Sequence, residues 1–152
     1  MITVQREVFD TGAEIRKMTA DRTDIGAVVS FTGLVRDFKE GKEVQALTLE
    51  HYPGMTEKQL AKIEDEANRR WRLQGSLIIH RYGRMEVSEP IVLVVTASAH
   101  RGDAFAAAEF LMDWLKTQAP FWKLEEDPDG STDWVSERKS DLEAANKWQQ
   151  SD

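Results

Sequence analysis

Apolar and polar residues alternate along several short segments of the chain, a pattern typical of β-strands with one buried face. Segments 25–35 and 90–98 are instead apolar runs rich in β-branched residues, which predicts buried strands. The predicted strands are 2–9, 25–35, 44–52, 75–83, 90–98, 121–127 and 132–138. Because the last two flank Pro-Asp-Gly-Ser at 128–131, we expect them to pair as a hairpin.

Two longer segments carry apolar residues at helical spacing. Over 57–71 these residues recur every three or four positions, after a Thr-x-x-Gln capping box. Over 103–119 they fall on one side, and Pro120 cannot continue the helix. Weaker patterns predict short helices at 11–20 and after Ser140. Because strands and helices mix without strict β-α-β alternation, the order predicts an α+β domain.

The length and composition narrow the class of protein. With 152 residues the chain can bury one core, which we assign to a single domain over 1–148, followed by a loose tail at 149–152. The net charge of −7 disfavours a nucleic-acid binder, and the absence of cysteine excludes disulfides, thiolate ligands and a cysteine nucleophile. The N-terminus lacks a signal-peptide pattern, and no apolar run is long enough to cross a bilayer. We therefore expect a cytoplasmic protein.

His100 and Arg101 form the first candidate for chemistry. They lie in the turn between the predicted strand that ends at Ser98 and the predicted helix that starts near Asp103. Backbone N–H groups at a helix N-terminus favour an anion, and an adjacent arginine and histidine would strengthen such a site. Alternatively, His100 only caps the helix and Arg101 pairs with Asp103. The residues themselves do not decide between these interpretations.

Three further cations adjoin apolar segments. Arg36 follows a predicted buried strand, where most arginines form surface pairs of little consequence. Lys116 and Lys123 flank the run Ala-Pro-Phe-Trp at 119–122. Their apolar stems can cover this run while the ammonium groups reach water. Alternatively, one or both ammonium groups lie at a pocket rim and hold a phosphate or take part in catalysis.

Other catalytic and ligand-binding patterns are missing. His51, His80 and His100 are far apart and lack metal-binding spacing, so we expect no metal. The sequence also lacks the glycine-rich motifs of nucleotide-binding loops and the Gly-x-Ser-x-Gly motif of hydrolases. The residue types therefore indicate a small anionic ligand held by Arg, His and Lys side chains.

Six segments, taken in this order and spacing, resemble the large, catalytic subunit of molybdopterin synthase. The resemblance extends from about residue 25 to Trp148. The segments are GAVVSFTGLVR at 26–36, ALTLEHYPGMTEK at 46–58, IIHRYG at 78–83, SAHR at 98–101, AFAAAEFLMDWLKTQAPFWK at 104–123 and WVSER at 134–138.

The resemblance implies a sulfurtransferase of molybdenum cofactor biosynthesis. Members of this family convert cyclic pyranopterin monophosphate, precursor Z, into molybdopterin by installing the two dithiolene sulfurs. The sulfur comes from a thiocarboxylate at the C-terminal Gly-Gly of a small ubiquitin-like subunit, whose tail inserts into a pocket of the large subunit. The implied fold contains an α/β hammerhead with an additional antiparallel sheet. The implied assembly is a homodimer carrying one small subunit at each end, a heterotetramer, and no metal or organic cofactor is required.

The resemblance also implies roles for individual residues. Lys116 would lie at the thiocarboxylate and stabilise developing charge, and Lys123 would act as a general acid or phosphate ligand. Arg138 matches a family arginine that reaches a neighbouring subunit's site. The implied substrate-binding residues are Leu34, Val35, Arg36, His100, Arg101, Lys116, Lys123, Leu124 and Glu125.

Two other functions compete with this interpretation. A non-catalytic module could keep the groove for a ubiquitin-like tail without turning over substrate, but loss of Arg36, His100, Lys116 or Lys123 would be expected, and all four are present. An unrelated phosphate-ester enzyme could use the same basic cluster and would need no protein partner. Co-purification with a small Gly-Gly-terminated protein would separate that enzyme from a molybdopterin synthase.

Overall fold

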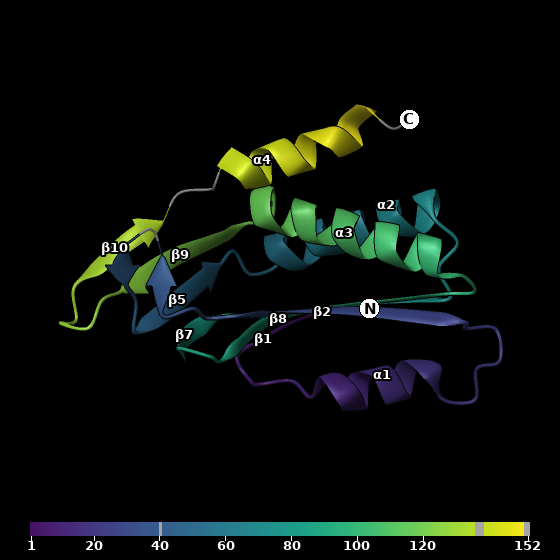
Figure 1. The fold of residues 1–152 in the computed structure, drawn as a ribbon, viewed down its shortest axis with the longest axis horizontal. Helices are drawn as coiled ribbons and strands as arrows, with labels where there is room; N and C mark the ends of the chain where they lie inside the picture. Colours follow the sequence, from purple (N-terminus) through teal and green to yellow (C-terminus); the bar gives the residue numbers. More distant parts are fainter. Residues whose placement is uncertain (40, 136–138, 151–152) are drawn as a thin grey trace.

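The computed structural model describes residues 1–39, 41–135 and 139–150, and within these ranges the chain has a mixed α+β fold, as predicted (Figure 1). The strands are β1 (Ile2–Gln5), β2 (Ala27–Leu34), β3 (Phe38–Lys39), β4 (Lys42–Glu43), β5 (Ala46–His51), β6 (Gly75–Arg81), β7 (Gly83–Glu86), β8 (Pro90–Ser98), β9 (Phe121–Glu126) and β10 (Thr132–Val135). The helices are α1 (Thr11–Thr19), α2 (Met55–Arg70), α3 (Arg101–Thr117), α4 (Lys139–Asn146) and the 3₁₀ turn η1 (Lys147–Gln150).

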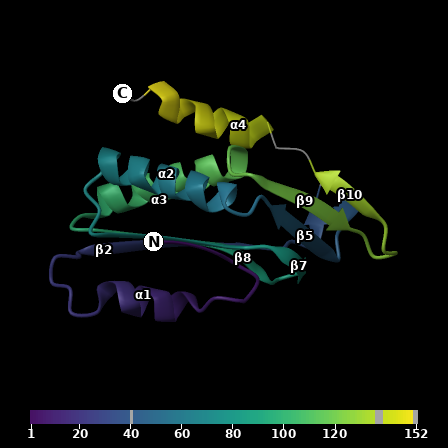
Figure 2. The same ribbon diagram turned by 180° about the vertical axis from the view of Figure 1, so that it is seen from behind.

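The first sheet, in the order β1-β6-β8-β2, is covered on both faces. Helices α2 and α3 lie over one face and α1 over the other (Figures 1 and 2). Alternate residues of the central strands point to opposite faces of the sheet. Ile78 and Val94 pack beneath α2 and α3, whereas Leu77 and Val95 pack with residues of α1. This two-sided burial explains why β8 is buried from Val92 to Ser98 and is apolar except for Thr96 and Ser98.

The second sheet, in the order β10-β9-β5-β7, extends from one end of the first (Figure 1). Its inner face contributes Leu47, Leu49 and Met85 to a small cluster that also contains Val35, just beyond β2. Strands β9 and β10 form the predicted hairpin. Its turn includes Gly130 at a φ of 91°, a conformation that favours glycine. Val35 therefore links the end of the first sheet to the core of the second.

The structure differs from the predicted elements in three segments. The strand predicted over 2–9 ends at Gln5. The charged segment 36–43, for which the sequence predicts no helix or strand, includes the short antiparallel pair β3 and β4. The connection 84–89, predicted to separate two strands, begins with β7, which pairs with β5. Strands β3 and β4 have two residues each, and Met85 is the one buried residue of the four in β7, so none of the three has an apolar alternation that the sequence could reveal. Within the described part of the chain, no helix is long and apolar enough to span a membrane.

Candidate active site

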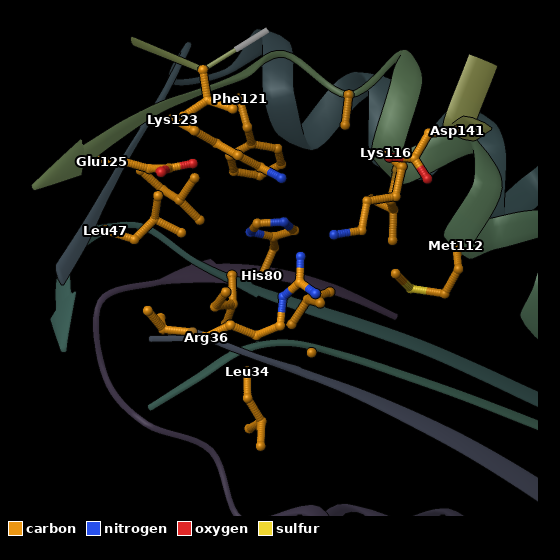
Figure 3. Close-up of a pocket in the computed structure, with 18 of the residues that line it drawn as sticks. Leu34, Arg36, Leu47, His80, Met112, Lys116, Phe121, Lys123, Glu125 and Asp141 are labelled. Atoms are coloured by element: carbon orange, nitrogen blue, oxygen red, sulfur yellow. The ribbon is translucent and has the colours of Figure 1, made fainter. Parts of the chain in front are cut away.

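A pocket of about 240 Å³ lies where the end of β2, the inner face of β9 and the C-terminal end of α3 meet (Figure 3). Its floor is largely apolar, with Leu47, Leu49, Met112 and Phe121 among its lining residues. The polar and charged side chains that line it are Arg36, His80, Lys116, Lys123, Glu125 and Asp141. Three cations, drawn from three separate segments of the chain, thus meet in one cavity.

Arg36 reaches the pocket because β2 ends in a local irregularity. The pairing of β2 with β8 shifts register between Gly33 and Leu34. A Cβ at Gly33 would come within 2.9 Å of Val92 Cγ1, so a larger residue there would collide with the Val92 side chain unless that side chain moved. Val35 then turns inward and is 4% exposed, while Leu34 and Arg36 on either side of it are exposed. All three predicted residues line the pocket.

Lys116 and Lys123 come from the two elements joined at Pro120. Lys116 lies in the last turn of α3, and its side chain points toward His80 (Figure 3). The side chains of β9 alternate, so Phe121, Lys123 and Glu125 line the pocket. Leu124 lies on the opposite face of β9, and its binding role stays a prediction.

His80 lies between Arg36 and Lys123 at the centre of the pocket, a position that the sequence did not single out (Figure 3). Its ring stacks on Phe121, with centroids 3.7 Å apart and planes 16° apart. Burial lowers the pKa of His80 to about 3, and the neighbouring charges of Lys123 and Lys116 add to this effect. The sequence did offer one signal: His80 lies two residues after Ile78, so it shares the buried face of β6 with an apolar residue although it is polar.

His100 and Arg101 lie at the other end of the first sheet. Ala27 of β2 pairs with Ser98, next to this turn, whereas Leu34 pairs with Pro90. At about 3.3 Å per residue, the two ends of β2 are roughly 20 Å apart, so one chain cannot bring the pair into its own pocket. Both residues are exposed.

Among the described residues, neither contact of the alternative interpretation, a cap by the His100 side chain or an Arg101–Asp103 ion pair, is present. His100 is the N-cap residue of α3, but its side chain makes no capping hydrogen bond. Asp103 accepts a hydrogen bond from the backbone N–H of Arg72 at 3.1 Å.

Arg138 lies outside the described residues. Within those residues, no group of three or more His, Asp or Glu side chains could hold a metal ion.

The arrangement is suited to an anionic ligand that is partly removed from water. Guanidinium and ammonium groups make strong charge-assisted bonds to phosphate and carboxylate oxygens, and the apolar floor reduces competition from solvent. These local charges act at short range, which reconciles the site with the acidic chain as a whole. Fold and site together define a small α+β protein with a cationic pocket for a small anion.

Comparison with known proteins identifies the family. Residues 4–118 match the family model described as MoaE protein. A relative from Pseudomonas aeruginosa named molybdopterin synthase catalytic subunit is 54% identical over 149 residues, covering 98% of this chain and 99% of the relative. The chain belongs to the family of molybdopterin synthase catalytic subunits.

Solved structures agree with this assignment. The molybdopterin biosynthesis MoaE protein from Burkholderia ambifaria matches with a TM-score of 0.82 and 49% identity, covering 98% of this chain and 97% of that one. The molybdopterin synthase from Staphylococcus aureus matches with a TM-score of 0.78 and 37% identity, covering 88% of this chain and 96% of that one. The match thus extends over the second sheet and the pocket.

Proposed function

We propose that this protein is the catalytic subunit of a molybdopterin synthase, a sulfurtransferase that converts precursor Z into molybdopterin. It acts with a small ubiquitin-like subunit whose C-terminal Gly-Gly thiocarboxylate supplies the sulfur. The observation that carries the proposal is the convergence of Arg36, Lys116 and Lys123 on one pocket in a chain of this family.

Each of the three cations has a separate role in the proposed reaction. Arg36, on the rim at the end of β2, holds the substrate phosphate through charge-assisted hydrogen bonds. Lys116, at the end of α3, stabilises the charge that develops on the acyl group as sulfur leaves it. Lys123, on the inner face of β9, acts as a general acid or as a second phosphate ligand. Glu125 and Leu124 are also proposed to contact the substrate.

His100 and Arg101 fit this scheme if they serve the pocket of a second copy. Strand β2 is an edge strand of the first sheet, and Ser30, Phe31 and Thr32 at its middle are exposed. A twofold axis near this midpoint would bring the His100 end of one strand beside the Arg36 end of the other. The proposed assembly is therefore a homodimer with a small subunit at each pocket, a heterotetramer, in which Arg138 also reaches the neighbouring site.

Three finer features are also proposed, the first from the family resemblance and the other two from the length and composition of the chain. They are the α/β hammerhead description of the fold, the single domain over 1–148 with a loose tail at 149–152, and a cytoplasmic location. The reaction is also proposed to need no metal or organic cofactor, because the partner delivers the sulfur.

The decisive experiment incubates the protein with precursor Z and the thiocarboxylated small subunit, and follows the product by mass. We expect a product that gains both dithiolene sulfurs, while the carboxylate form of the small subunit gives none. A chain that binds the small subunit but forms no product is a non-catalytic binding module. A chain that binds precursor Z but no small subunit fits an unrelated phosphate-ester enzyme.

A further inference from the structure

His80 is a hydrogen-bond acceptor among cations. Arg36, Lys116 and Lys123 can only donate hydrogen bonds, which suits them to the oxygens of a phosphate. A pterin also presents N–H and O–H donors, and these require acceptors when they leave water. Among the described side chains that line the pocket, His80, Glu125 and Asp141 can accept, and His80 lies between Arg36 and Lys123 (Figure 3).

The backbone fixes the tautomer of His80. Its Nδ1 lies 2.9 Å from the carbonyl oxygen of Arg81, which can only accept. Nδ1 therefore carries the proton, and Nε2 keeps its lone pair for the pocket. Stacking on Phe121 fixes the ring plane, so the lone pair has a defined direction.

His80 also remains uncharged at working pH. Burial is the main cause that lowers the pKa of His80 to about 3, and the groups facing it contribute to the same shift: Lys123 from β9, Lys116 from α3 and His51 from β5. A neutral ring accepts a hydrogen bond, whereas an imidazolium could not. The same cations that bind the phosphate thus keep this acceptor available.

We propose that Nε2 of His80 accepts a hydrogen bond from an N–H or O–H group of the pterin substrate and so sets the orientation of its uncharged end. This role rests on the proposed function and deepens it. Arg36 then holds the anionic end, and the two contacts together present one face of the pterin to the incoming sulfur. A purely structural role, in which the ring only supports Phe121 and hence the inner face of β9, is the competing explanation.

Two substitutions separate these roles. His80→Phe keeps an aromatic ring against Phe121 but removes the acceptor, whereas His80→Gln keeps an acceptor but removes the ring. The measurement is the Kd for precursor Z with the small subunit in its carboxylate form, which binds without transferring sulfur. We expect His80→Phe to weaken binding by about tenfold or more, and His80→Gln to weaken it less. Wild-type affinity in His80→Phe, or a greater loss in His80→Gln, would overturn the proposal.

A second measurement needs no substitution. With ¹⁵N-labelled histidine in the wild-type protein, we expect the Nε2 resonance of His80 to shift when precursor Z is added. An unchanged resonance in the saturated complex would overturn the proposal. Turnover by the wild-type protein tests the proposed function separately. Normal turnover with an unchanged resonance would contradict the His80 role alone. Failure of the wild-type protein to form product with the thiocarboxylated partner would contradict the proposed sulfurtransferase function.

Discussion

The backbone N–H of Val35 donates a 3.0 Å hydrogen bond to the carbonyl of Glu89, tying the end of β2 to the residue before β8. The carbonyl of Val35 in turn accepts from the N–H of Ser88 at 2.8 Å. Behind this pair lies Arg81, 7% exposed, which donates to the carbonyl of Pro90 at 2.8 Å and forms an ion pair with Glu89. The position of Arg36 therefore depends on a buried guanidinium outside the pocket.

Replacing Arg81 should destabilise this support. Arg81→Ala leaves the carbonyls of Arg6 and Pro90 without their donor, so we expect the free energy of unfolding to fall by about 2–4 kcal/mol. Arg84→Ala is the matched control, because Arg84 is half exposed and ion pairs at the surface contribute little to stability. Urea unfolding measures both. Equal losses in the two variants would contradict a special role for Arg81.

Removing either pocket lysine should abolish most turnover while leaving the fold intact. For Lys116→Ala and Lys123→Ala we expect kcat to fall by about 100-fold or more, because each removes a charge that faces the reacting groups. Lys58→Ala, an exposed lysine on α2, is the control and should retain normal activity. Product formation from precursor Z and thiocarboxylated partner is the readout. Near-normal turnover in either pocket variant would remove that lysine from the mechanism.

Mixed dimers test whether the site is shared between copies. Arg36→Ala and His100→Ala should each inactivate a homodimer, because each removes one half of every site. A heterodimer of the two, isolated through different tags, contains one doubly altered site and one intact site. We expect it to recover about half of the wild-type activity. If both residues acted within one chain, the heterodimer would stay inactive; if His100 were uninvolved, its own homodimer would be active.

The buried His80 should make stability depend on pH. Its folded-state pKa of about 3 lies below the ordinary 6.5, so the unfolded chain binds more protons between these values. The contribution is fully present above pH 6.5 and is lost as the pH falls toward 3, with a slope approaching about 1.4 kcal/mol per pH unit. Subtracting the unfolding free energies of His80→Phe from those of the wild type isolates this term. A difference that stays constant from pH 7 to pH 4 would show that His80 titrates normally.

The sequence predicted the elements with strong periodicity. Helices α2 and α3 and strand β9 match their predictions within about two residues, and β10 begins where predicted, because apolar spacing, Pro120 and the Asp-Gly turn act locally. The predicted end of the last strand, 136–138, lies outside the described residues. It could not predict that Arg36 meets Lys116 and Lys123, since that meeting depends on how the two sheets join. The resemblance supplied those residues, but it did not show that His100 is remote within one chain.

His80 was missed for a different reason. In the sequence it is an isolated histidine without metal-binding spacing, which more often indicates a satisfied core residue than a ligand. Only the stack with Phe121 and the nearby ammonium groups show that it lines the pocket. Long-range packing, rather than local pattern, determines its environment.

The alternation of β9 limits where this chain can change length. A one-residue deletion between Thr117 and Phe121 would rotate the strand by half a turn, so that Trp122 pointed inward and Lys123 outward. The number of residues in that connection is therefore as constrained as the lysines themselves. The β9–β10 turn around Gly130 is exposed and carries no pocket residue, so insertions and deletions among natural variants should accumulate there instead.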